Sequence, residues 1–153
     1  MRTTHRRIRG TGDDGSAVVE FLGAALILLV PVVYLVLVLG RLQSAAFAVD
    51  GAAREAARTF VAASDTGTAQ ERAVAAVALA LDDQGLPAED AAGALSLTCS
   101  AEECLDPGGT VEATVRVDVA LPGVPGFVQG VVPLTVLVSG RATAATDTYR
   151  GNG

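Results

Sequence analysis

The sequence predicts an α+β protein in which a long N-terminal transmembrane helix continues outside the membrane and packs on a small, mainly antiparallel three-stranded sheet. An uncharged apolar run at 21–40 is followed by helical periodicity to about residue 64. Three later segments have the period of two that is typical of strands. The 153 residues are enough for one ordinary domain and not for two large ones.

Twenty consecutive residues without a charge, 21–40, form the first element. As a helix they span roughly 30 Å, the thickness of the bilayer hydrocarbon, so we expect a transmembrane segment at about 18–40. A buried core helix is the alternative, but the other elements are too short and Ala-rich to cover it. A secretory signal peptide cut near Ala46 is a second alternative, although its apolar region is usually only about 7–15 residues long.

Charge distribution predicts the orientation of this segment. Four arginines precede it within the first 15 residues, while the chain from Arg41 onward has 7 Arg and 14 acidic residues and contains no Lys. By the positive-inside rule the N-terminus is cytoplasmic and the C-terminal region extracytoplasmic. An acidic, Lys-free exterior argues against nucleic acid as a partner, because phosphate binding requires a basic surface.

The junction before the run carries a carboxylate, Glu20, at the mouth of the predicted membrane helix. A charge there is costly unless it is paired, by roughly 2.5–3.5 kcal/mol at the helix centre and less near the interface. Cleavage after Gly15 would make Ser16 the new N-terminus, with an ammonium group four residues before Glu20 on the same helix face. The alternative interpretation is that Gly15 is linker and Glu20 a helix-start acid favoured by the macrodipole.

This junction resembles that of type IV prepilins, in which a basic leader ends in Gly, a membrane peptidase cuts after it, and Glu is the fifth mature residue. The Glu-Phe pair at 20–21 is similar to the tight-adherence (Flp) branch, and the AAREAAR segment at 52–58 resembles the TadE-like minor pseudopilins. The similarity covers about residues 10–60 and is one of layout beyond them. It implies a leader at 1–15, cleavage between Gly15 and Ser16, and pairing of helices through Glu20 during pilus assembly.

Residues 16–64 are predicted to form one helix. Beyond the membrane its apolar positions have spacings of 4 and 3, typical of a narrow coiled-coil stripe. The stripe comprises Leu42, Ala46, Val49, Ala53, Ala56, Phe60 and Ala63. We expect it to pack against helices of other subunits, with docking on the chain's own C-terminal module as the alternative. Asp50 with Arg54, and Glu55 with Arg58, have the spacing of helical ion pairs.

The extracytoplasmic module at 65–153 is predicted to contain a second amphipathic helix at about 69–83 and strands in 94–100, 110–122 and 133–147. In the middle strand Val111 and every second residue to Val119 face one way, and polar residues face the other. The Gly- and Pro-rich link 123–133 is interpreted as a loop with exposed apolar residues, available to the membrane or to a partner.

Cys99 and Cys104 are expected to form a disulfide, because two nearby cysteines outside the cytoplasm pair readily. A metal site would need more thiol or imidazole ligands, and the single His is in the leader. We therefore expect no metal, no cofactor, no catalytic residues and no enzymatic activity.

The expected function is that of a minor pilin or pseudopilin acting in pilus assembly or adhesion, with the membrane, prepilin peptidase, other pilins and the pilus assembly machinery as partners. The alternative is an uncleaved single-pass membrane protein with an extracytoplasmic binding module. The chain is too long for a short major Flp pilin. The residues do not distinguish the TadE-like type from the TadF or TadG types.

Overall fold

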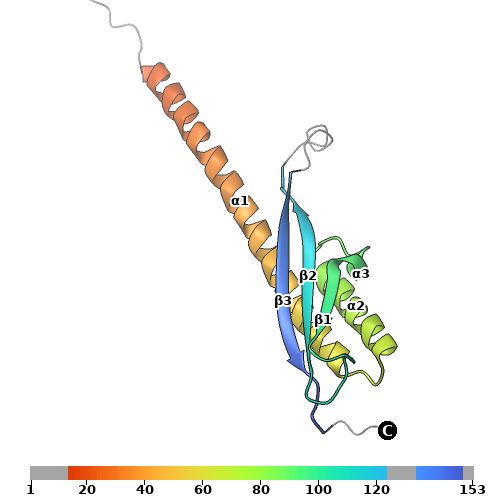
Figure 1. Cartoon of the computed structure of the whole chain (residues 1–153). Coiled ribbons are helices and arrows are strands. Elements are labelled where there is room, and N and C mark those ends of the chain that lie inside the picture. The colour runs from red at the N-terminus through yellow and green to blue at the C-terminus, as the bar shows by residue number, and fades with distance from the viewer. Residues whose placement is uncertain (1–13, 124–133, 150–153) are drawn as a thin grey trace, which may run out of the picture. The chain divides into compact units, whose positions relative to one another are not determined.

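The computed structural model describes residues 14–123 and 134–149, with only the backbone at 14–16. Most of the predicted leader and of the predicted 123–133 loop therefore lies outside the described residues. The elements are α1 (Asp14–Val61), α2 (Thr66–Asp82), α3 (Ala91–Ala94), β1 (Leu95–Cys99), β2 (Thr110–Ala120) and β3 (Thr135–Ala145) (Figure 1). The predicted α+β class is confirmed: a long apolar N-terminal helix accompanies a three-stranded antiparallel sheet.

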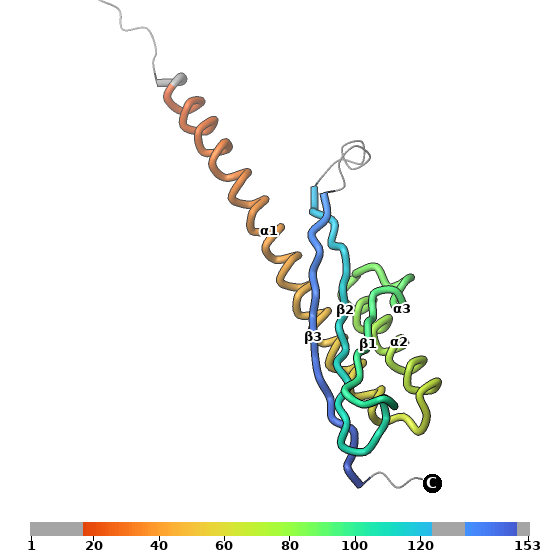
Figure 2. The backbone as a smooth tube through the Cα atoms, in the orientation of Figure 1, coloured from red at the N-terminus to blue at the C-terminus, as the bar shows by residue number. Residues whose placement is uncertain are grey.

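The chain divides into two compact units, Met1–Leu37 and Val38–Gly153, and α1 contributes to both. We call residues 17–37 the apolar half of α1 and residues 38–61 its docking half. In the first unit the helix continues through Pro31, which has no amide hydrogen to donate to the carbonyl of Ile27. The backbone trace shows α1 as one unbroken coil (Figure 2).

The sheet of the second unit has the order β1-β2-β3, and both pairs are antiparallel. In the central strand the residues with odd numbers from Val111 to Val119 are all buried, as the alternation predicts. The intervening residues lie on the other face, where only Thr114 is also buried. Leu121 continues the β2–β3 pairing beyond the strands, since its amide donates to the carbonyl of Leu134 over 3.1 Å.

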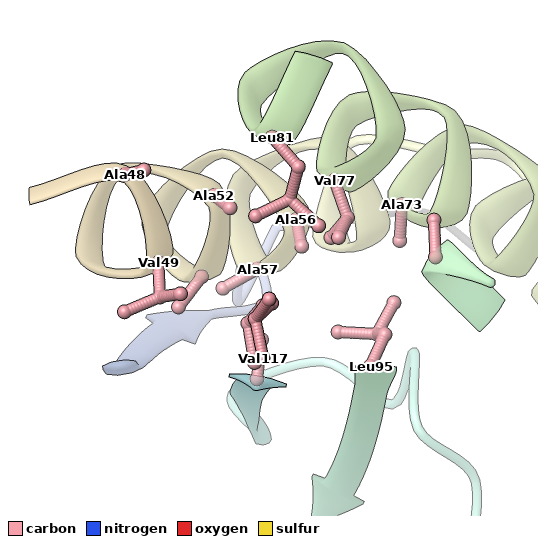
Figure 3. Close-up of a cluster of buried hydrophobic side chains, with 14 of the residues drawn as sticks. Ala48, Val49, Ala52, Ala56, Ala57, Ala73, Val77, Leu81, Leu95 and Val117 are labelled. Carbon is pink, nitrogen blue, oxygen red and sulfur yellow. The ribbon is translucent and has the colours of Figure 1, made fainter. Parts of the chain in front are cut away.

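The docking half of α1 and helix α2 lie on one side of this sheet, as the ribbon shows (Figure 1). A single apolar cluster fills the space between them. In the close-up, Val49 and Ala57 lie on the sheet side of α1, while Ala56 is close to Leu81 of α2 (Figure 3). The core is built mainly from Ala and Val, and Phe60 is its largest fully buried side chain.

A glycine in β3 permits a close approach between this strand and the backbone of α1 at Val49 and Asp50. A Cβ atom added to Gly140 would lie 2.5 Å from the backbone nitrogen of Asp50 and 2.5 Å from the carbonyl carbon of Val49. No side chain fits at this distance, so the strand needs glycine here. Gly140 therefore sets how closely the edge of the sheet packs on the docking half.

Helix α2 has specific contacts at each end. At its N-terminus Asp65 is the cap, and the Thr68 amide donates to the Asp65 carboxylate over 2.9 Å. This hydrogen bond is the main reason that the pKa of Asp65 lies below its ordinary value of 3.8. At the C-terminal end the Arg41 guanidinium of α1 donates to the carbonyl oxygens of Gln84 and Gly85, over 3.3 and 2.8 Å.

Candidate functional site

The apolar half of α1 is the most unusual surface of the described chain. Every large apolar side chain from residue 18 to residue 37 is exposed, by between 41% at Tyr34 and 75% at Ile27. Within the part of the chain that the structure describes, none of this stretch is buried, and the helix is long and apolar enough to cross a membrane. Soluble proteins rarely expose so large a contiguous apolar surface, so this half requires lipid or other helices around it.

Glu20 lies at the head of that apolar surface, one residue before Phe21. Its side chain is exposed, and no ion pair joins it to any residue of the described ranges 17–123 and 134–149. The nearest cations along the sequence are the leader arginines, which belong to residues 1–13 and lie outside the description. As described, the carboxylate is therefore an acceptor available to a cation from elsewhere.

Gly15 and Ser16, the predicted cleavage residues, both have helical backbone in the first turn of α1. Ser16 and Glu20 are four residues apart in one continuous helix, and positions with this spacing share a helix face. The side chains at residues 14–16 lie outside the description. Cleavage itself thus remains a prediction.

Arg41 is the first charged residue after the apolar run, and sequence reasoning assigned it no role. Its guanidinium binds carbonyl oxygens at the end of α2, where the helix macrodipole is negative. Nearby, the Ser44 hydroxyl donates to the side-chain oxygen of Gln84 over 3.0 Å. These contacts hold the C-terminal end of α2 beside α1 at the point where the uncharged run of α1 ends.

The expectation that the alanine stripe of α1 packs against other subunits is wrong for the residues buried in the chain's own core. From the predicted stripe Val49, Ala53, Ala56, Phe60 and Ala63 are fully buried, whereas Ala46 is exposed. The buried face is also wider than predicted, because it packs on the sheet and on α2 at once. The additional buried positions are Ala45, Ala48, Ala52 and Ala57.

The opposite face of the docking half is solvent-exposed and largely polar. The two predicted ion pairs are present there, with Asp50–Arg54 at 3.6 Å and Glu55–Arg58 at 3.8 Å. Phe47 also lies on this face and is 77% exposed.

The predicted disulfide joins Cys99 at the end of β1 to Cys104, with the two Cα atoms 5.1 Å apart. It closes the turn that carries Glu102 and Glu103. Within residues 14–123 and 134–149, no three His, Cys, Asp or Glu side chains are grouped so that they can hold a metal ion.

The described residues define a class of protein: a helix with an exposed apolar half, joined to a disulfide-containing α+β module. Comparison of the chain with protein-family models, curated proteins and solved structures finds no match. The resemblance to TadE-like pseudopilins therefore depends on the sequence motifs alone.

Proposed function

We propose that this chain is a minor pilin or pseudopilin of a tight-adherence (Flp-type) pilus system, processed after Gly15 and acting in pilus assembly or adhesion. In this proposal α1 anchors the chain in the cytoplasmic membrane, with the N-terminus inside and the C-terminal module outside. The chain is a packing component rather than an enzyme.

The observation that carries the proposal is the carboxylate of Glu20 at the head of an apolar helix whose large side chains are exposed. A membrane-embedded carboxylate needs a counter-ion, and residues 21–40 provide none. Cleavage after Gly15 creates one, because the new Ser16 ammonium is one helical turn away. The same ammonium is also available to Glu20 of a neighbouring subunit, which gives a register for helices packed side by side.

Two further observations support the orientation. The leader arginines precede the apolar run, as the positive-inside rule requires for a cytoplasmic N-terminus. The Cys99–Cys104 disulfide favours an oxidising compartment for the module, and this argument is independent of the arginines.

The burial pattern restricts which part of α1 is available to other subunits. The alanine face of the docking half is occupied by the chain's own sheet and by α2. The apolar half has no such cover in the described structure. Assembly in the proposed mechanism therefore uses the apolar half and Glu20, and the module is presented as a folded unit.

The decisive measurement is the intact mass of the full-length chain purified from membranes of a strain with a prepilin peptidase. The proposal predicts a species that begins at Ser16. Gly15→Leu should prevent this cleavage, whereas Gly12→Leu, another leader glycine, is the matched control and should leave it unchanged. A wild-type mass that begins at Met1 would contradict the proposal and favour the uncleaved anchored protein.

Assembly is tested separately by replacing the carboxylate. Glu20→Gln should strongly reduce the amount of the chain that sediments with sheared surface filaments, because the neutral side chain cannot form an ion pair with an ammonium. Glu55→Gln, on the exposed face of the docking half, is the matched control. Equal recovery of the two variants in the filament fraction counts against the packing role of Glu20.

A further inference from the structure

The sheet exposes its large apolar side chains at one end only. Among the described sheet residues, those exposed are Leu134, Val136 and Leu137, at 37%, 37% and 62%. Together with Leu121, which is hydrogen-bonded to Leu134, we call them the apolar strand end. They interrupt the strand alternation, since Val136, Leu137 and Val138 are three consecutive apolar residues.

Leu137 is on the outer sheet face, whose other side chains are mostly polar, whereas Val136 lies on the helix-facing side with its partner Val119. Arg141 pairs with Glu112 at 3.4 Å, and Thr143 is exposed on the same side of β3. By contrast, the described residues 119–123 and 134–140 carry no charge, and the first charges beyond them are Asp118 and Arg141. The exposed apolar area is thus local and has a sharp polar border.

The apolar strand end is level with the point where the apolar run of α1 ends. Arg41, the first charge after that run, lines the same surface depression as Val119 and Ala120 of β2. Ala120 pairs with Thr135, the first residue of β3. The strand end and Arg41 therefore occupy the same end of the second unit.

The backbone contact between β3 and α1 also places the start of β3 toward the end of the apolar run. Gly140 contacts α1 at Val49, and Thr135 is five strand residues earlier, about 16 Å at 3.3 Å per residue. From this contact α1 and β3 both run back toward the same end of the second unit, although they cross at an angle (Figure 1). A bilayer that holds residues 21–40 has its surface near this end.

We propose that the apolar strand end lies in the interfacial region of the membrane, on the side of the C-terminal module, and contacts lipid. This inference depends on the membrane anchoring in the proposed function and does not depend on cleavage or on a pilus. Lipid is the favoured occupant because Arg41, the residue that directly follows the apolar run, lies at this same end of the second unit. Asp118, opposite Leu137 in the strand register, limits the contact to the headgroup region, where its carboxylate stays hydrated.

The chain contains no Trp, so a single introduced Trp is an unambiguous fluorescent reporter. Leu137→Trp tests the strand end from the outer sheet face. Leu134→Trp, directly before β3, repeats the test from the opposite face. Thr143→Trp is the matched control, since it lies on the same face of β3 six residues further on, about 20 Å away. Leu29→Trp in the apolar half reports on anchoring.

Each full-length variant is inserted into vesicles of phosphatidylcholine with a minor fraction of phosphatidylglycerol. The phosphatidylcholine carries bromine either near the headgroup end or near the methyl end of its acyl chains. We expect Leu137→Trp and Leu134→Trp to emit at shorter wavelength than Thr143→Trp and to lose intensity with shallow bromine. Thr143→Trp should keep its intensity with both lipids, and Leu29→Trp should be quenched.

If Leu29→Trp is quenched while Leu137→Trp and Leu134→Trp are not, the lipid contact is disproved and the anchoring stands. A blue shift at Leu137→Trp without bromine quenching, which disappears when the protein is diluted in the vesicles, assigns the surface to a second copy and also overturns the inference. If Leu29→Trp is not quenched, the anchoring fails and the inference fails with it.

Discussion

Helix α1 exposes its large apolar side chains between residues 18 and 37, whereas between residues 45 and 57 it buries mainly alanine. The apolar half has Leu, Val and Ile around its whole circumference, and no part of its membrane-length window is buried by the described residues. The docking half has small residues on one broad face and ion pairs on the other. One continuous helix therefore presents two different surfaces.

The difference shows what each half is built to contact. Large apolar side chains all round a helix suit a surrounding of lipid or packed apolar helices. Small side chains on one face permit close packing, and at Val49 the glycine of β3, Gly140, lets the strand approach the helix backbone. Large buried side chains in the docking half are therefore few. Substitutions of these side chains should have the largest effects on the stability of the module.

The largest difference in stability is expected between substitutions of the two phenylalanines of the docking half. Phe60 is 1% exposed in the core and Phe47 is 77% exposed on the outer face. Phe60→Ala should destabilise the module by about 3–5 kcal/mol, because it leaves a cavity that an alanine-rich surrounding cannot fill. Phe47→Ala should change stability by less than about 0.5 kcal/mol. Denaturant unfolding of the full chain in mild detergent, followed by circular dichroism, measures both; equal losses would contradict the burial difference.

Two glycines sharpen the comparison between the close-packed face and the open face. Gly140→Ala places a methyl group against the backbone of α1 and should cost about 1–3 kcal/mol. Gly51→Ala is the matched control, since a Cβ there meets nothing within 4 Å, and it should stabilise the helix by up to about 1 kcal/mol. The midpoint of denaturant unfolding should therefore decrease in Gly140→Ala and increase in Gly51→Ala. A neutral Gly140→Ala would mean that β3 does not need to approach α1 so closely.

A smaller effect is expected at the boundary between the halves. Arg41→Ala removes the donors to the carbonyl oxygens of Gln84 and Gly85 and should cost about 1–2 kcal/mol. Arg54→Ala removes only the exposed ion pair with Asp50 and should cost about 0–1 kcal/mol. Amide hydrogen exchange at the end of α2 should accelerate in the first variant alone. Unchanged exchange in Arg41→Ala would show that α2 does not depend on this contact.

The smallest effect is expected at Asp65, the N-terminal cap of α2. Because its pKa is lowered in the folded state, Asp65 stabilises the module fully above its ordinary value of 3.8. This contribution is lost as the pH falls through the lowered folded pKa, when the proton replaces the charge that accepts the Thr68 amide. A pH series of unfolding midpoints should therefore show a small decrease at acidic pH. In Asp65→Asn, the share of this decrease that comes from protonation of Asp65 should be absent. A pH series identical to that of the wild type would contradict the assignment.

Much of the fold could be predicted from local pattern. The uncharged run at 21–40, the inward valines of β2 and the short Cys99–Cys104 separation each depend on neighbours in sequence, and periodicity or spacing reports such features directly. The candidate site at Gly15, Ser16 and Glu20 was likewise found from motif and charge. Its processing is still a prediction, because the structure describes only the backbone at the first two of these residues.

The width of the buried face of α1 could not be predicted in this way. A spacing of 4 and 3 describes a helix with one partner, but α1 packs on two, the sheet and α2. Ala45, Ala48, Ala52 and Ala57 are therefore buried, and Ala46, which fits the narrow stripe, is exposed. In an alanine-rich helix nearly every position is compatible with burial, so composition does not select among them.

By itself, the sequence determined an apolar helix of membrane-spanning length with a carboxylate at its head, followed by three strands and a disulfide. Tertiary structure alone decided which alanines are used internally, that Arg41 closes the end of α2, and that Gly140 admits the backbone of α1. The physical reason is range: periodicity and charge act over a few neighbouring residues, whereas these contacts join residues more than twenty positions apart, and only the packed fold brings them together.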